Sequence, residues 1–178
     1  DDGAVYEGEF RDGKQHGTGT FRLPGGYEYT GEWVDGRIEG RGVAKYPNGS
    51  VYEGEFRDGA PHGRGRIVYA DGGSYEGDWR QGMMSGEGVL TQSDGVVYRG
   101  GFSQSAFDGE GVLTRPNGYR YEGGWRENAP HGDGVVTYPD GAVYRGAFVD
   151  GLREGRGTIE MPDGFRYEGD WAAGEMTG

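Results

Sequence analysis

Aromatic residues and glycines recur at even spacings along this chain, separated by polar residues, and the whole pattern repeats every 23 residues. Each repeat begins with a tyrosine, followed by a glycine two residues later and by Phe or Trp four residues later. Alternate residues of a β-strand point to the same face, so this spacing predicts a strand with its rings and glycines on one side. The tyrosines that begin the repeats are Tyr6, Tyr29, Tyr52, Tyr75, Tyr98, Tyr121, Tyr144 and Tyr167.

A second strand is predicted in each repeat, because Gly, Gly and an apolar residue follow the tyrosine by 11, 13 and 15 residues. Pairs such as Asp12-Gly13 separate the two strands, and pairs such as Asn48-Gly49 separate one repeat from the next. These dipeptides supply the positive φ that tight turns require. Each repeat is therefore expected to be a β-hairpin. A single hairpin cannot bury its rings, so neighbouring hairpins must stack.

The large number of glycines has a structural explanation in this arrangement. Glycine accounts for 41 of the 178 residues, and the aromatic content of 13% argues against disorder. A strand glycine marks close approach, and a ring that covers it compensates for the missing side chain. We therefore expect the rings to lie over glycine backbone 2, 11 and 13 residues after each tyrosine. The glycines predicted to be structural are Gly31, Gly54, Gly77, Gly123, Gly40, Gly42, Gly63 and Gly65.

The motif Tyr-x-Gly-x-[Phe/Trp]-x-x-Gly-x-x-x-Gly-x-Gly, which covers essentially the whole chain, resembles the MORN repeat (membrane occupation and recognition nexus). The resemblance implies an all-β fold, an elongated single-layer twisted antiparallel sheet or solenoid-like array of tandem 23-residue β-hairpin repeats. We expect one array over residues 1–178 with about eight repeats, the last of them truncated. The family also implies partner binding in a cytoplasmic, cytoskeletal or membrane-associated setting, and no chemistry of the chain's own.

A second period of 46 residues is visible, because Phe and Trp alternate strictly at the fourth position after the tyrosine. Two interpretations are open: duplication of a two-repeat block, and an exchange of bulk between neighbours that keeps the sheet packed as it twists. The second predicts that Phe56→Trp destabilises the protein by roughly 1–3 kcal/mol through overpacking. The alternating residues are Phe10, Trp33, Phe56, Trp79, Phe102, Trp125, Phe148 and Trp171.

The fifth repeat departs from the pattern. Ser105 replaces the turn glycine, and Gly101 replaces the usual carboxylate three residues after the tyrosine. Phe107 is then expected to be an exposed aromatic residue of the turn, either through drift in a loop or as a contact point for a partner. In the sixth repeat Asn128 takes the turn position, where it tolerates positive φ.

Catalytic and metal-binding residue types are present, but their spacing argues against chemistry. Histidine occurs only at His16, His62 and His131, and two repeats correspond to roughly 19 Å. These histidines cannot share a metal, so we expect them to cap turns. Carboxylate pairs such as Glu7 and Glu9 can perform acid–base chemistry on glycosides. Here they form a repeating stripe, which predicts a solvated face opposite the rings. The arginines predicted to balance that face are Arg41, Arg64 and Arg156.

No site for chemistry is therefore predicted. The chain has no cysteine and no Ser-His-Asp set or nucleophile elbow. Its Gly-x-Gly pairs lack the third glycine of a dinucleotide loop. We expect no catalytic residue, no cofactor and no metal.

The function predicted from these features is a non-enzymatic interaction scaffold or adaptor. A formal net charge of −12 is unfavourable for binding nucleic acid and favours a basic partner. We expect an aromatic-lined groove that holds a helical or extended, basic segment of a partner protein. The rings predicted to contact it are Tyr29, Trp33, Tyr52, Phe56, Tyr75, Trp79, Tyr98, Phe102, Tyr121, Trp125, Tyr144 and Phe148.

Three further possibilities are open. The family name suggests phospholipid or membrane-surface binding, which the charge disfavours and which would rest on a local patch of basic residues. The chain could also be the regulatory repeat region of a larger enzyme. The terminal edge strands invite a homodimer. The basic residues of the local patch are Arg57, Arg64, Arg66 and Arg80.

Overall fold

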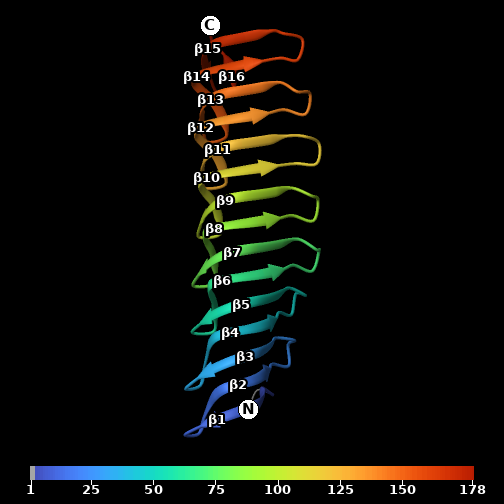
Figure 1. Cartoon of the computed structure of the whole chain (residues 1–178), viewed down its shortest axis with the longest axis vertical. Helices are drawn as coiled ribbons and strands as arrows, with labels where there is room; N and C mark the ends of the chain where they lie inside the picture. Colours follow the sequence, from blue (N-terminus) through green and yellow to red (C-terminus); the bar gives the residue numbers. More distant parts are fainter. Residues whose placement is uncertain (1–2) are drawn as a thin grey trace. The chain divides into compact units, whose positions relative to one another are not determined.

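A computed structural model describes residues 3–178, and all regular secondary structure in this range is β-strand. The strands are antiparallel and lie in the sheet in sequence order. The chain forms two compact units, residues 1–86 and residues 87–178, and β8 (Met83–Thr91) runs across the boundary. Figure 1 shows the successive hairpins within each unit. The prediction of an all-β array of hairpin repeats is confirmed.

The strands alternate between seven and nine residues within each repeat, apart from the short final strand. Unit 1 contains β1 (Val5–Arg11), β2 (Lys14–Arg22), β3 (Glu28–Val34), β4 (Arg37–Lys45), β5 (Val51–Arg57), β6 (Ala60–Val68) and β7 (Ser74–Arg80). Unit 2 contains β9 (Val97–Ser103), β10 (Ala106–Thr114), β11 (Arg120–Arg126), β12 (Ala129–Thr137), β13 (Val143–Val149), β14 (Leu152–Glu160), β15 (Arg166–Ala172) and β16 (Glu175–Met176).

The turn inside each hairpin has positive φ at both central residues, as in Asp12 (51°) and Gly13 (79°). This is the type I′ conformation, whose twist matches that of the flanking strands. The fifth repeat keeps it without glycine, because Gln104 and Ser105 adopt φ of 48° and 65°. Since this turn is not enlarged, β10 begins at Ala106. The prediction that Phe107 belongs to the turn is therefore wrong.

The turn between hairpins has a different construction. The amide of Tyr46 donates to the carbonyl of Ser50 (2.9 Å), and the amide of Gly49 donates to the carbonyl of Tyr46 (3.0 Å). The Asn48 side-chain oxygen accepts from the amide of Ser50 (2.9 Å). Aspartate and asparagine stabilise such turns because the side chain can bond to the backbone two residues on. Only the glycine, Gly49, needs positive φ here (92°).

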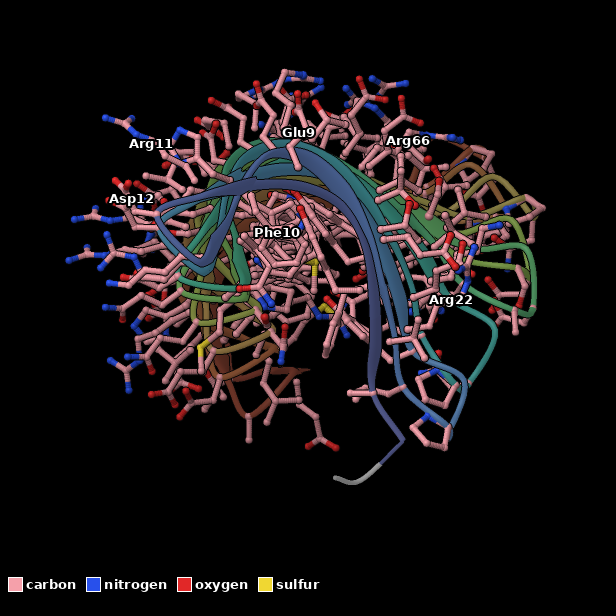
Figure 2. The ribbon with its side chains drawn as sticks, turned by 90° about the horizontal axis from the view of Figure 1, so that it is seen from below. Glu9, Phe10, Arg11, Asp12, Arg22 and Arg66 are labelled. Atoms are coloured by element: carbon pink, nitrogen blue, oxygen red, sulfur yellow. The ribbon has the colours of Figure 1, made fainter. Side chains whose placement is uncertain are left out.

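The hairpins of the first, second, third, fifth, sixth and seventh repeats each contain a bulge. In the second repeat, Gly31 pairs with Gly42 and Trp33 pairs with Ile38, so three residues of β4 lie opposite one residue of β3. Gly40, at the middle of the extra segment, has φ of 91°. Bulges bend a strand and increase its twist. Figure 2 shows the resulting curvature of unit 1, in which Phe10 points to the concave side and Glu9 and Arg66 point to the convex side.

The core consists of the rings on the concave side. The repeat tyrosines from Tyr29 to Tyr144 are 0–1% exposed, and the Phe and Trp residues from Trp33 to Trp171 are 4–7% exposed. Within each unit, a repeat tyrosine packs edge-to-face against the aromatic residue of its own repeat and, where another repeat of the unit follows, against that of the next. Tyr52, for example, lies 5.0 Å from Phe56 and 5.2 Å from Trp79 between ring centroids. Aromatic pairs prefer this geometry, so the ring ladder holds successive hairpins together.

Candidate partner-binding surface

The twelve rings predicted to contact a partner are the packed core of the sheet. Their polar atoms bond within the chain: the Tyr29 hydroxyl donates to the carbonyl of Glu32 (2.8 Å), and the Trp33 indole N–H donates to the carbonyl of Gly19 (3.1 Å). Burial raises the pKa of the tyrosine hydroxyls, as at Tyr29. A partner would therefore meet the edges of this ring layer. Contact between these rings and a partner stays a prediction.

The alternation of Phe and Trp has a visible consequence. The indole N–H of each Trp donates to a glycine carbonyl of the preceding repeat, as from Trp79 to Gly65 (3.0 Å). Phe cannot make this bond, so every second repeat gains one additional hydrogen bond to its neighbour. The exchange of bulk between neighbours stays a prediction.

The predicted structural glycines fall into two groups. In the first, a Cβ on Gly42 would lie 2.5 Å from the Tyr29 ring, and a Cβ on Gly31 would lie 2.5 Å from the Gly42 Cα. The rings therefore do cover bare glycine backbone. The other members of this group are Gly54, Gly65, Gly123 and Gly77; Gly77 is buried and pairs with Gly65.

Gly40 and Gly63 form the second group, and here the predicted reason is wrong. They occupy the bulge with φ of 91° and 82°, and a side-chain carboxylate covers each of them. At Gly63 this is the carboxylate of Glu55, which accepts a hydrogen bond from the amide of Arg64 (2.6 Å). No ring is involved, because the bulge turns this glycine toward the convex face.

The carboxylate stripe on the convex face is therefore partly structural. Glu9, Glu32 and Glu55 each accept a backbone amide of the bulge. The predicted arginine balance is confirmed for Arg64, which lies 2.8 Å from Asp78, and for Arg156, which lies 3.6 Å from Asp170. The Arg41 side chain forms no ion pair within residues 3–178.

The histidines cap turns, as predicted. The Nδ1 atoms of His16, His62 and His131 accept the amide of the first turn residue of the next hairpin at 3.3–3.4 Å. Glu39 performs the same role for Asp58 (3.2 Å). Among the described residues no three His, Asp or Glu side chains come close enough to hold a metal ion.

Phe107 lies within the ring layer of unit 2. It stacks on Tyr98 with 3.8 Å between centroids and 7° between planes, and meets Trp125 edge-to-face at 5.3 Å. It pairs with Phe102, at the register position that Ile38 and Pro61 occupy in other repeats. The half-buried ring thus adds to the concave surface instead of standing in a loop.

A second row of tyrosines extends the aromatic surface of unit 1 toward the turns between hairpins. Tyr27 contacts Phe21 and Tyr46, with centroid distances of 6.4 and 5.7 Å. Tyr27, Tyr46 and Tyr69 are half-buried. Burial, with the neighbouring Tyr46 as a smaller cause, raises the pKa of Tyr27 to about 12. We call these three residues the marginal tyrosines. Sequence reasoning did not select them, although their positions beside the turns are visible in the sequence.

The marginal tyrosines differ from the core tyrosines in hydrogen bonding. Every repeat tyrosine donates to a backbone carbonyl, whereas the hydroxyls of the marginal tyrosines bond to no described residue. In unit 2 the related rings are covered by arginines instead: Arg115 lies over Tyr119 at 4.8 Å, and Arg153 lies over Tyr138 at 5.9 Å. The marginal tyrosines therefore offer both ring surface and unused donors.

The described part of the chain has no helix long and apolar enough to cross a membrane. The sequence matches the MORN repeat in eight consecutive segments: residues 6–26, 29–51, 52–74, 75–97, 98–118, 121–143, 144–166 and 167–178. No curated protein sequence matches the chain.

Among solved structures, the chain is similar to the TCP10 domain of CPAP from Danio rerio, with 18% sequence identity, coverage of 90% of this chain and 80% of that chain, and a TM-score of 0.46. It is also similar to the TCP domain of SAS-4 (dCPAP) from Drosophila melanogaster, solved in complex with a proline-rich motif of Ana2 (dSTIL), with 16% identity, coverage of 72% and 82%, and a TM-score of 0.41. Since its repeat segments extend from residue 6 to residue 178, this chain belongs to the MORN repeat family.

Proposed function

We propose that this chain is a non-enzymatic interaction scaffold whose concave, ring-bearing face binds a helical or extended, basic segment of a partner protein. The observation that carries the proposal is the row of marginal tyrosines, Tyr27, Tyr46 and Tyr69, with half-exposed rings and unused hydroxyls. Tyrosine suits an interface because it brings large rigid contact area and a polar end at low entropy cost. The packed ring layer beside the marginal tyrosines is a rigid surface that does not need to reorganise when a partner binds.

The charge distribution supports a basic partner. The hairpin turns of unit 1 carry Asp12, Asp35 and Asp58, all exposed, and the chain has a net charge of −12. Charge complementarity raises the rate of encounter and suppresses wrong partners more than it raises affinity. A basic segment would therefore approach quickly and then depend on the tyrosines for affinity.

The absence of catalysis is proposed because the groups capable of acid–base chemistry have structural roles. His16 and His62 accept turn amides, and Glu32 and Glu55 accept bulge amides. Pairing of two copies through β1 or β16 stays a prediction.

The test is affinity capture of partner proteins from a lysate with wild-type chain, with Tyr46→Ala/Tyr69→Ala and with Val149→Ser. Val149 is exposed at 44% and lies outside the ring layer, so its variant is the control. We expect the tyrosine variant to lose basic partners that the control retains, with both variants equally folded by circular dichroism. Equal capture by all three proteins would contradict the proposal.

A further inference from the structure

Two hollows lie side by side on the convex face of unit 1 and share Arg64. The first has a volume of about 370 Å³, and its walls include Arg41, Arg64, Arg66 and Val68. The second has a volume of about 510 Å³, and its walls include Arg57, Arg64, Arg80 and Trp79. The side chain of Arg66 points to the convex side in Figure 2. The stacking of hairpins thus gathers five arginines from the four strands β4 to β7 around these two hollows. We call Arg41, Arg57, Arg64, Arg66 and Arg80 the arginine patch.

The second hollow comes from the bulge. Gly63 and Gly86 line it, have positive φ and carry no side chain that would fill the space. The same hollow exists 46 residues earlier, where it is bounded by Gly17 and Gly40 and has a volume of about 310 Å³. The backbone shape is therefore a property of the repeat and indicates no ligand by itself.

The side chains of the two related hollows differ in charge. Position by position, Thr18 stands where the second hollow has Arg64, and Val34 stands where it has Arg80. Glu39 stands in place of Ser85. The earlier hollow is thus acidic and the later one is basic, although the surrounding hairpins have the same construction. Of these two related hollows, only the later one is lined by arginines.

Most of the arginine patch is not neutralised by the chain. Arg64 pairs with Asp78 at 2.8 Å, and Arg66 pairs with Glu76 at 3.7 Å. The guanidinium groups of Arg41, Arg57 and Arg80 form no ion pair with any residue that the structure describes. All three are exposed, in a chain of net charge −12. A free guanidinium presents a planar fork of donors that suits carboxylate and phosphate groups.

The geometry favours a narrow anionic ligand over an anionic membrane. Glu53 and Glu76 line the first hollow among the arginines, so a broad negative surface would be repelled where a thin segment would pass between them. Arg57 is the last residue of β5 and Arg80 is the last residue of β7. These strands are two strand spacings apart, so the two arginines are roughly 9–10 Å from each other. An extended chain in the polyproline II conformation rises about 3.1 Å per residue with three residues per turn, so acidic side chains at every third residue would share one face and meet both arginines.

We propose that the arginine patch is a second binding surface, which holds an extended acidic segment of a partner protein with anionic side chains three residues apart. The apolar wall at Val68 would pack against the intervening residues. This surface is on the opposite face from the marginal tyrosines and selects the opposite charge. It does not depend on the basic partner proposed above, so one chain can hold two partners of different chemistry.

The test is fluorescence anisotropy with a labelled peptide of repeated Glu-Gly-Gly triplets at low ionic strength. We expect wild type to bind it and Arg57→Gln/Arg80→Gln to bind about tenfold more weakly, as the loss of two exposed ion pairs implies. Arg11→Gln/Arg126→Gln is the matched control, because both arginines occupy the same repeat position outside the patch. This control should bind within about twofold of wild type.

Two further measurements make the result decisive. A peptide of the same charge with consecutive glutamates should bind more weakly, because fewer pairs of its side chains lie three residues apart. Thr18→Arg/Val34→Arg should add a second site in the related hollow. The proposal is overturned if wild type does not bind the triplet peptide, if the control loses as much affinity as the patch variant, or if only anionic lipid vesicles bind. Loss of basic partners in the tyrosine variant is a separate readout and leaves this result unaffected.

Discussion

Replacing Gly65 by alanine tests the central structural feature, a ring held on bare backbone. A Cβ at position 65 would lie within 2.5 Å of the Tyr52 ring, far inside van der Waals contact. Tyr52 has no room to retreat, because its side chain is fully buried between Phe56 and Trp79 and its hydroxyl donates to the carbonyl of Glu55 at 2.7 Å. Overpacking of this kind costs about 1–3 kcal/mol, and loss of the hydroxyl bond adds about 1 kcal/mol.

We therefore expect Gly65→Ala to lower the free energy of unfolding by roughly 2–4 kcal/mol. The assay is urea unfolding followed by tryptophan fluorescence, with an unchanged m-value showing that only stability has changed. Gly25→Ala is the control, because a Cβ there meets nothing within 4 Å; its effect should stay within about 1 kcal/mol. Tyr52→Phe in the Gly65→Ala background should recover part of the loss. A cost below about 0.5 kcal/mol for Gly65→Ala would refute the account of the core.

Three further predictions concern the turns, the alternating rings and alkaline pH. Ser105→Gly should stabilise the protein by about 1 kcal/mol, because φ of 65° suits glycine; an unchanged melting temperature would contradict this. Phe56→Trp should destabilise by roughly 1–3 kcal/mol in urea unfolding, and a neutral result would exclude bulk exchange between repeats. Burial raises the pKa of Tyr52, and that of Tyr27 to about 12, from an ordinary value of 10.0. The native chain thus keeps phenolic protons that the unfolded chain releases, so stability should be full below pH 10 and fall as pH rises toward 12. Tyrosinate absorbance should then appear together with unfolding; early, non-cooperative ionisation would refute it.

Much of the fold follows from the sequence because its signals are local. A spacing of two residues indicates a strand, and Asp-Gly or Asn-Gly indicates positive φ at a turn. Both depend on residues a few positions apart, and both predictions are confirmed. Phe107 shows the limit of this reasoning. The sequence placed Phe107 in the turn as an exposed ring, yet Ser105 adopts positive φ without glycine and Phe107 pairs with Phe102 in the strand.

The candidate surfaces were harder to predict, because they depend on how hairpins stack. Trp79 of the next repeat covers the Tyr52 ring, and the Tyr52 hydroxyl donates to the carbonyl of Glu55 in its own repeat. The burial of Tyr52 therefore cannot be predicted from one repeat alone. The arginine patch likewise contains both Arg41 and Arg80, which are 39 positions apart in the sequence. Periodicity can place each residue on a face, but only stacking shows which residues become neighbours there.

The sequence by itself determined the strands, the turns and the face that carries the rings, because φ preferences and a two-residue period act within a few residues. Only the tertiary structure decided which rings remain accessible and which cations share a hollow. The physical reason is the bulge around Gly40 and its equivalents, which bends the sheet and turns the glycine toward the convex side. The curvature brings the rings together on the concave side and separates the side chains around the hollows on the convex side. It arises only when several hairpins with bulges are stacked.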